Sequence, residues 1–132
     1  MPKYVAKALH NFKQSLQKFH TNNKPEYSPH KHVEPKYGQK VQYAEPTKDE
    51  PTLDSVDINL IQKIVGTFLY YGIAVDNTIL VILSTIASEQ SAATSNTEKK
   101  TTQLLNYLAT NPDATIRYKR SDMVLWVNSN TS

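Results

Sequence analysis

The sequence predicts a mainly α-helical fold: a small helical bundle preceded by a basic amphipathic helix and a proline-rich extended linker, and followed by a C-terminal β-hairpin, which together make a partial α+β domain. Three observations predict it. Apolar residues recur at helical spacing in several segments. Five of the seven prolines lie between positions 25 and 51, and after Pro112 the apolar pattern changes to alternation.

Residues 1–20 are predicted to form the amphipathic helix. Apolar side chains recur every three to five residues from Tyr4 to Phe19, and the lysines fall largely off that face. One side of the helix therefore needs a partner, and the other faces water or phosphate. Residues 21–52 are the predicted linker, because proline cannot propagate a helix, and we expect this segment to act as a tether or a strap.

Residues 53–111 are predicted to hold three helices that form the bundle. The first begins after Asp54, a good N-cap residue, and we expect it to end or bend near Gly72. The second begins at Asp76, and the third runs roughly from Glu98 to Ala109. The apolar side chains at helical spacing in these segments are Ile58, Ile61, Ile64, Val65, Phe68, Leu69, Ile79, Leu80, Ile82, Leu83, Ile86, Leu104, Leu105, Tyr107 and Leu108.

Residues 112–132 are predicted to form the hairpin. Ile116 and Tyr118 share one face of a first strand, KRSD makes the turn, and Met123 to Val127 form a second, strongly apolar strand. A lone hairpin is marginally stable in water, so it must dock on the helices or belong to a larger sheet.

Charge is distributed unevenly along the chain. Residues 1–48 hold nine lysines against three glutamates, whereas residues 49–132 hold six Lys or Arg against nine acids. This asymmetry predicts an N-terminal arm that faces a polyanion, and the alternative is a solvated basic tail. The absence of cysteine, of a signal peptide and of a membrane-spanning stretch predicts a cytoplasmic or nuclear protein that contacts no membrane.

The sequence offers no convincing catalytic or metal site, so no cofactor is expected. Four histidines, His10, His20, His30 and His32, raise the question of zinc or copper, but only the last two are close, and a proline-rich linker does not fix ligand geometry. A metal hydrolase that uses these histidines is the last-ranked hypothesis. The carboxylates in the folded part, Asp54, Asp57, Asp76 and Asp113, are explained as helix caps or turn residues.

The lysines of the arm and linker are the candidate contacts with nucleic acid, because Lys neutralises phosphates and releases their counterions. We expect the aromatic residues of the first helix to belong to the core and not to stack on bases, since they share its apolar stripe. The candidate phosphate contacts are Lys3, Lys7, Lys13, Lys18, Lys31, Lys36 and Lys40.

Four segments together resemble the part of copia-type retrotransposon polyproteins that joins the reverse transcriptase palm to the RNase H domain. They are MPKYVAKALHNF, SPHKHVEPKYGQKVQYAEP, IQKIVGTFLYYGIAVDNTILVILSTIASEQS and TTQLLNYLATNPDATIRYKRSDMVLWVNS, and they cover nearly the whole chain in the family's order. The most specific match is LLNYLATNPDATIRY followed by SDMVL. No segment is a catalytic signature.

The resemblance implies that residues 1–20 leave the palm, that the linker and helices form the thumb and connection, and that the last strand begins RNase H. In the family that strand is followed by a pattern like S-D-A-S, whose Asp binds the catalytic metal, Mg²⁺ in the intact parent enzyme; here Asn130 stands at that position. A neutral amide is a poor substitute for a metal-bridging carboxylate.

The resemblance therefore implies a catalytically inert fragment, a truncated or degenerate copy or a piece of a longer chain. Its inherited task would be to contact the backbone of an RNA–DNA hybrid or another nucleic acid. The alternative is a small helical module for protein–protein interaction or self-association through exposed apolar surface, without a nucleic-acid function.

Overall fold

The computed structural model describes residues 1–12, 15, 24–32, 34, 37–38, 51–117, 119–120 and 123–124. Over these residues the protein is mainly helical, as predicted, and contains no strand. The helices within the described ranges are α1 (Tyr4–Phe12), α2 (Ser55–Ala74), α3 (Leu80–Glu89) and α4 (Ser95–Thr110), and the short 3₁₀ turns η2 (Asn77–Ile79) and η3 (Gln90–Ala92) flank α3.

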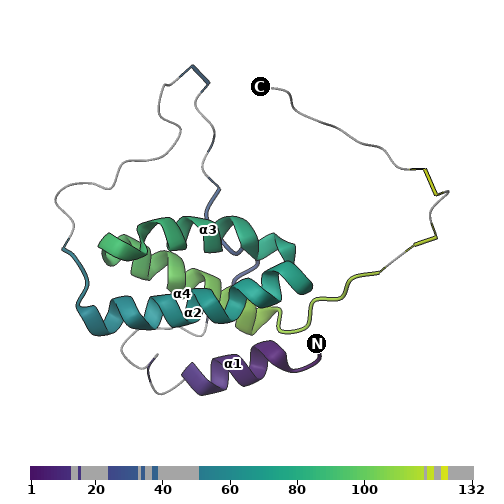
Figure 1. Ribbon diagram of the computed structural model, residues 1–132, viewed down its shortest axis with the longest axis horizontal. Coiled ribbons are helices and arrows are strands. Elements are labelled where there is room, and N and C mark those ends of the chain that lie inside the picture. Colours follow the sequence, from purple (N-terminus) through teal and green to yellow (C-terminus); the bar gives the residue numbers. More distant parts are fainter. Residues whose placement is uncertain are drawn as a thin grey trace.

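The helices α2, α3 and α4 pack side by side, and α1 lies across the side of this bundle opposite α3 (Figure 1). The core that they share is formed by apolar side chains from all four helices and from η2. Its buried members are Val5, Ala8, Leu60, Ile61, Ile64, Val65, Phe68, Tyr71, Ile79, Ile82, Leu83, Ile86, Ala93, Leu104, Leu105 and Leu108. The first helix is therefore an integral part of the bundle. The sequence pattern predicted it as a separate arm that precedes a bundle of three helices.

The start of α2 is as predicted. Asp54 is the N-cap, and its carboxylate accepts a hydrogen bond from the Ser55 amide at 2.7 Å. The helix also ends near Gly72, as predicted, since its last residue is Ala74. Gly72 has a packing role as well: a Cβ atom there would lie 2.9 Å from a methyl carbon of Leu80, so its missing side chain lets α3 begin directly against α2.

Asp76 begins the second helical segment, as predicted, by capping η2. Its carboxylate is buried and accepts hydrogen bonds from the Thr78 amide at 3.2 Å and the Thr78 hydroxyl at 2.5 Å. The chain then turns directly into α3. An Asp at this point satisfies amide groups that a tight connection between two helices would otherwise leave without partners.

The helix α4 begins at Ser95, three residues before the predicted start at Glu98. A reciprocal capping box explains the difference: the Thr94 side chain bonds the Thr97 amide, and the Thr97 side chain bonds the Thr94 amide. The Thr97 hydroxyl also donates to the Glu89 carboxylate at 3.0 Å, and Glu89 pairs with Lys100. These contacts fix the corner between α3 and α4.

Residues 24–32 of the predicted linker are described, and they lie against the surface of α4. The Glu26 amide donates to the Thr110 hydroxyl at 3.1 Å, and the Gln103 side chain donates to the Ser28 carbonyl at 3.2 Å. This part of the linker is thus a strap across α4, one of the two roles expected for it.

No strand of the predicted C-terminal hairpin is seen in the described residues of that stretch. Ile116, Arg117, Lys119, Arg120 and Val124 are not in strands, and Met123 has φ = 61°, which is not an extended conformation. Tyr118, residues 121–122 and residues 125–132 lie outside the described residues, so only the part of the second strand from residue 125 to 127 stays a prediction.

Candidate nucleic-acid interface

The packing of α1 decides which of its side chains face outward. The Tyr4 hydroxyl donates to the Thr67 carbonyl at 3.0 Å, and the Tyr4 ring stacks on Tyr71 with centroids 5.6 Å apart and planes within 7°. Phe12 packs against Phe68 with a centroid separation of 6.4 Å. The aromatic residues of α1 therefore pack on the bundle, as predicted, and the polar side of the helix faces solvent.

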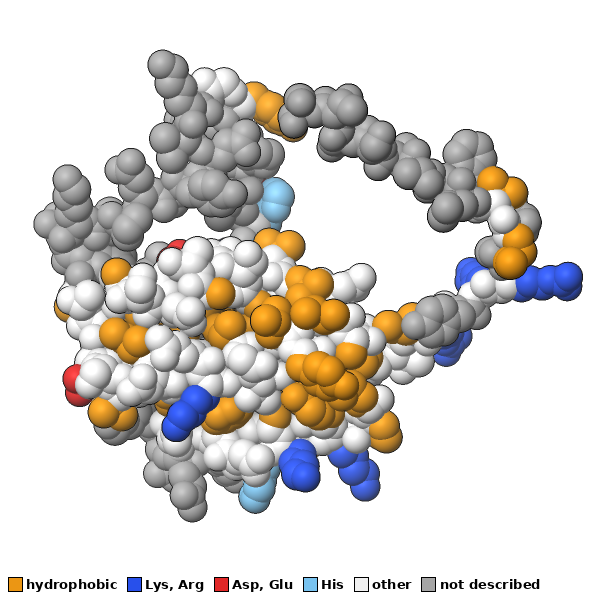
Figure 2. Space-filling model, viewed as in Figure 1, with side chains coloured by type: hydrophobic (Ala, Val, Ile, Leu, Met, Phe, Trp, Pro, Cys, Tyr) orange, Lys and Arg blue, Asp and Glu red, His pale blue; other side chains and the backbone are white. Residues whose placement is uncertain are grey.

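Exposed basic side chains lie on that outer side. Lys3, Lys7 and His10 are exposed, and among the described residues no acidic side chain pairs with either lysine. Lys63 of α2 is exposed too, and its carbonyl accepts from the same Thr67 whose carbonyl binds Tyr4. Figure 2 shows blue side chains along the edge of the bundle where Figure 1 draws α1, and the acidic side chains seen in this view lie elsewhere.

Lys63 was not among the lysines selected from the sequence. In the sequence Lys63 is a single charged residue among the apolar residues of α2. That pattern predicts a solvent-exposed side chain but does not predict that it lies near the first helix. The contact between Tyr4 and Thr67 brings the two helices together, and that contact joins residues 63 positions apart in the chain.

The other predicted phosphate contacts are not brought to this surface by any described contact. Lys31 is exposed on the strap, which lies against α4. Lys13, Lys18, Lys36 and Lys40 lie outside the described residues, as does Asn130. Of the predicted contacts, Lys3 and Lys7 are therefore the ones described at α1, and Lys63 is a further exposed lysine four residues before Thr67 on α2.

A carboxylate already occupies the amino end of α1. The Lys3 amide donates to Asp113 at 3.4 Å, and Lys3 itself has φ = 64°, the left-handed conformation that only a minority of non-glycine residues adopt. A negative charge at a helix N-terminus is favourable. Because Asp113 takes this place, a phosphate would be held by the lysine side chains and not by the amide groups of the helix end.

Two shallow hollows of about 260 Å³ each lie on the described surface. One lies between α1 and α2. It is lined by Tyr4, Lys7, Ala8, Asn11, Phe12 and Thr67. Both are smaller than the 300 Å³ or more that sites for small organic ligands commonly have.

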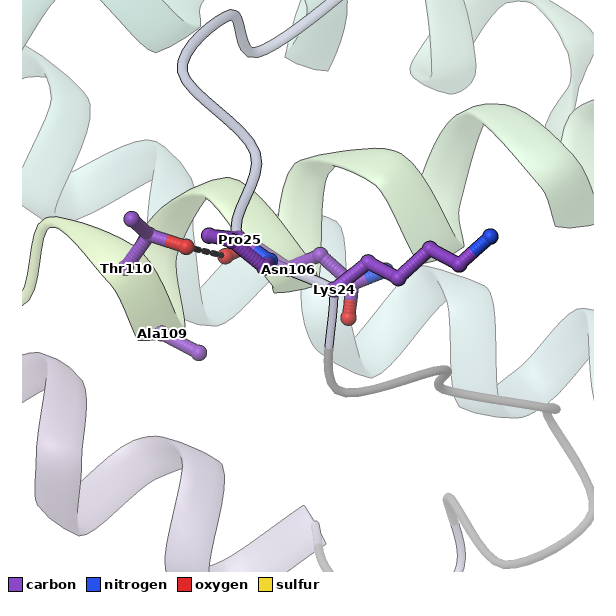
Figure 3. Close-up of a pocket in the computed structure, with 5 residues that line it drawn as sticks. All are labelled: Lys24, Pro25, Asn106, Ala109 and Thr110. Atoms are coloured by element: carbon purple, nitrogen blue, oxygen red, sulfur yellow. Dashed lines mark hydrogen bonds between the residues drawn. The ribbon is translucent and has the colours of Figure 1, made fainter.

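The second hollow lies where the strap crosses α4 (Figure 3). It is lined by Lys24, Pro25, Asn106, Ala109 and Thr110. The Thr110 hydroxyl donates to the Asn106 carbonyl at 2.8 Å and accepts from the Glu26 amide, so its hydrogen-bonding capacity is used by the fold. The ammonium group of Lys24 extends away from the other lining residues in this view.

In the part of the chain that the structure describes, no three histidine, aspartate or glutamate side chains gather as a metal site would require. None of the helices formed by those residues combines the length and apolar character needed to cross a bilayer. No protein-family model matches the chain, and no curated protein or solved structure matches it either.

Proposed function

We propose that this protein is a non-catalytic module that contacts the phosphate backbone of nucleic acid, as the thumb and connection part of a retrotransposon reverse transcriptase would. The observation that carries the proposal is the orientation of α1. Tyr4, Val5 and Phe12 face the bundle and fix the orientation of the helix, so Lys7 on its outer side and Lys3 just before its first residue are left exposed. An RNA–DNA hybrid is the proposed partner, as the family resemblance implies.

The electrostatics of such a contact are simple. Each lysine that approaches a phosphate releases condensed counterions, which gives affinity without reading the base sequence. A rigid helix loses less side-chain and backbone freedom on binding than a mobile tail, so the docked α1 supports tighter binding than the same lysines on an unfolded arm. Lys63 extends the surface onto α2.

The proposal includes the absence of polymerase and nuclease activity in this chain. It is supported by the sequence, because Asn130 stands where the related pattern has the metal-binding Asp. Four of the described carboxylates have roles in the fold: Asp54 and Asp76 cap helices, Glu89 fixes the corner between α3 and α4, and Asp113 binds the Lys3 amide.

Reversing the charges of α1 is the direct test. Lys3→Glu together with Lys7→Glu is expected to weaken binding to a fluorescently labelled RNA–DNA hybrid by on the order of tenfold or more, because two attractive contacts become repulsive. Fluorescence anisotropy at fixed salt measures the change. Lys99→Glu, at an exposed position on α4, changes the charge by the same two units as Lys7→Glu alone and is the matched control for that single variant. An equal loss in the control, or no binding by the wild-type protein, contradicts the proposal.

An uncharged surface favours the alternative function, a helical interaction module. Between Lys63 and Glu89 the sequence holds one Asp, Glu, Lys, Arg or His, namely Asp76, and this residue is buried. The outer sides of α3 and of the second half of α2 therefore carry no charged side chain. If a second copy covers this surface, sedimentation will show a mass that rises with concentration and is unaffected by nucleic acid.

A further inference from the structure

The segment that follows α4 carries a cluster of basic side chains. Arg117, Lys119 and Arg120 place three positive charges within four positions, and both arginines of the chain are among them. All three side chains are exposed, and none forms an ion pair with an acidic side chain that the structure describes. None of them is among the phosphate contacts predicted from the sequence. We call these three residues the exit cluster.

The chain reaches the exit cluster from the amino end of α1. Two hydrogen bonds fix it there: the Lys3 amide donates to Asp113 at 3.4 Å, and the Ala114 amide donates to the Tyr71 hydroxyl at 3.1 Å. Tyr71 also stacks on Tyr4, the first residue of α1. Figure 1 shows the chain leaving the bundle beside the N-terminus. The fold therefore brings the start of this segment to Lys3, although Lys3 and Asp113 are 110 positions apart.

We infer that the exit cluster binds the phosphate backbone of nucleic acid together with Lys3 and Lys7, so that both groups contact one duplex. The inference rests on the proposed function and extends it to a second segment of the chain. Arg117 is four positions after Asp113, a stretch that spans at most about 14 Å. Double-stranded DNA carries one negative charge for about every 1.7 Å of its axis, and a hybrid has the same number of phosphates per base pair. Several phosphates therefore lie within reach of both groups.

The side chains of the cluster suit this partner. The guanidinium group of arginine is a planar fork that can donate two parallel hydrogen bonds to one phosphate, which a lysine cannot do. Because no described acid pairs with the cluster, its contact with phosphate breaks no ion pair that the structure shows. Asp113 is the acidic side chain that a described contact places between the two groups, and its carboxylate already accepts from the Lys3 amide.

An anionic membrane is another polyanion that attracts basic segments. Segments that lie on membranes commonly form amphipathic helices, whose apolar face enters the lipid. None of the described residues from 111 to 124 is helical. The apolar side of α1 is packed on the bundle through Tyr4 and Phe12, so it is not available to lipid either. These observations favour nucleic acid as the partner of the exit cluster.

Neutralising the cluster tests the inference. The triple variant Arg117→Gln, Lys119→Gln and Arg120→Gln keeps Lys3 and Lys7. It should weaken binding to a blunt-ended RNA–DNA hybrid by on the order of tenfold or more and reduce the salt slope of the affinity by about 3, roughly 1 for each lost phosphate contact. Fluorescence anisotropy over a series of salt concentrations measures both. The three side chains are exposed, so circular dichroism should show an unchanged helix content.

Two controls separate phosphate contact from net charge. Arg117→Lys with Arg120→Lys keeps both charges and should keep the wild-type salt slope. Lys99→Gln removes one charge from an exposed position near the start of α4, the end away from Asp113. It is the matched control for Arg117→Gln alone, which should lower the slope by about 1, whereas Lys99→Gln should leave it unchanged. An equal fall in both single variants would be an effect of net charge, and the inference would be wrong.

The same measurements distinguish this inference from the proposed function. If Lys3→Gln with Lys7→Gln weakens hybrid binding and the triple variant does not, the inference is overturned and the proposed function stands. If the wild-type protein does not bind the hybrid, both are overturned. Vesicles of phosphatidylcholine and phosphatidylserine are the second probe. Tighter binding to these vesicles than to the hybrid, lost in the triple variant, would assign the cluster to a membrane and overturn the inference.

Discussion

Replacing Tyr71 with alanine is expected to destabilise the protein by about 3–5 kcal/mol, the range for truncating a large buried aromatic residue. Tyr71 is only 1% exposed, its ring stacks on Tyr4, and its hydroxyl accepts from the Ala114 amide. One side chain therefore joins α1, α2 and the segment after α4. The free energy of unfolding of a domain of this size is roughly 5–15 kcal/mol, so the substitution would remove a large share of the stability.

Urea unfolding followed by circular dichroism measures this loss. Tyr71→Phe keeps the ring and removes the hydroxyl, so it should cost only about 1 kcal/mol, the net value of a hydrogen bond. Tyr70→Ala is the positional control. The side chain of Tyr70, the residue before Tyr71, is 61% exposed, so its removal should change the free energy of unfolding far less. If Tyr71→Ala and Tyr70→Ala are equally stable, the described packing of α1 on α2 is wrong.

The two glycines of α2 are expected to respond oppositely to alanine. A Cβ at Gly66 meets nothing within 4 Å, so Gly66→Ala should stabilise the protein by about 0.5–1 kcal/mol through helix propensity alone. At Gly72 the stabilisation from helix propensity is offset by steric overlap, because the new methyl group would lie 2.9 Å from a side-chain carbon of Leu80 and 3.2 Å from one of Ile79. The Leu80 side chain can rotate, whereas Ile79 is fully buried and cannot move without disturbing the core.

The difference between these two variants isolates the packing effect, since both replace glycine with alanine inside one helix. Gly72→Ala should be less stable than Gly66→Ala by about 1–3 kcal/mol, the usual cost of overpacking. Thermal and urea unfolding of both variants beside the wild type give this difference. Equal stabilities would mean that α3 does not approach α2 as closely as described.

Local sequence signals predicted the elements whose determinants are neighbours in the chain. The cap at Asp54, the start at Asp76 and the helical periodicity from Ile58 to Phe68 all act within one or two turns, and the structure confirms them. The aromatic residues of α1 were predicted to be buried because they share one stripe, and Tyr4 and Phe12 do pack on the bundle.

What the sequence did not predict depends on contacts between distant residues. The packing role of Gly72 comes from the approach of α3, whose Leu80 occupies the space that a side chain at Gly72 would need. The contact of α1 with α2 depends on the Tyr4 hydrogen bond to Thr67, which no local pattern encodes. The start of α4 is an exception, because its capping box is local but has Thr97 where Glu or Gln is usual.

The salt dependence of binding tests the central claim, that Lys3 and Lys7 hold phosphates, most directly. For the wild-type protein the logarithm of the affinity for an RNA–DNA hybrid should fall linearly with the logarithm of the salt concentration. Neutralising both residues, with Lys3→Gln and Lys7→Gln, should reduce that slope by about 2, roughly 1 for each lost phosphate contact. A wild-type affinity that does not fall with salt, or a slope that the double variant leaves unchanged, would contradict the claim.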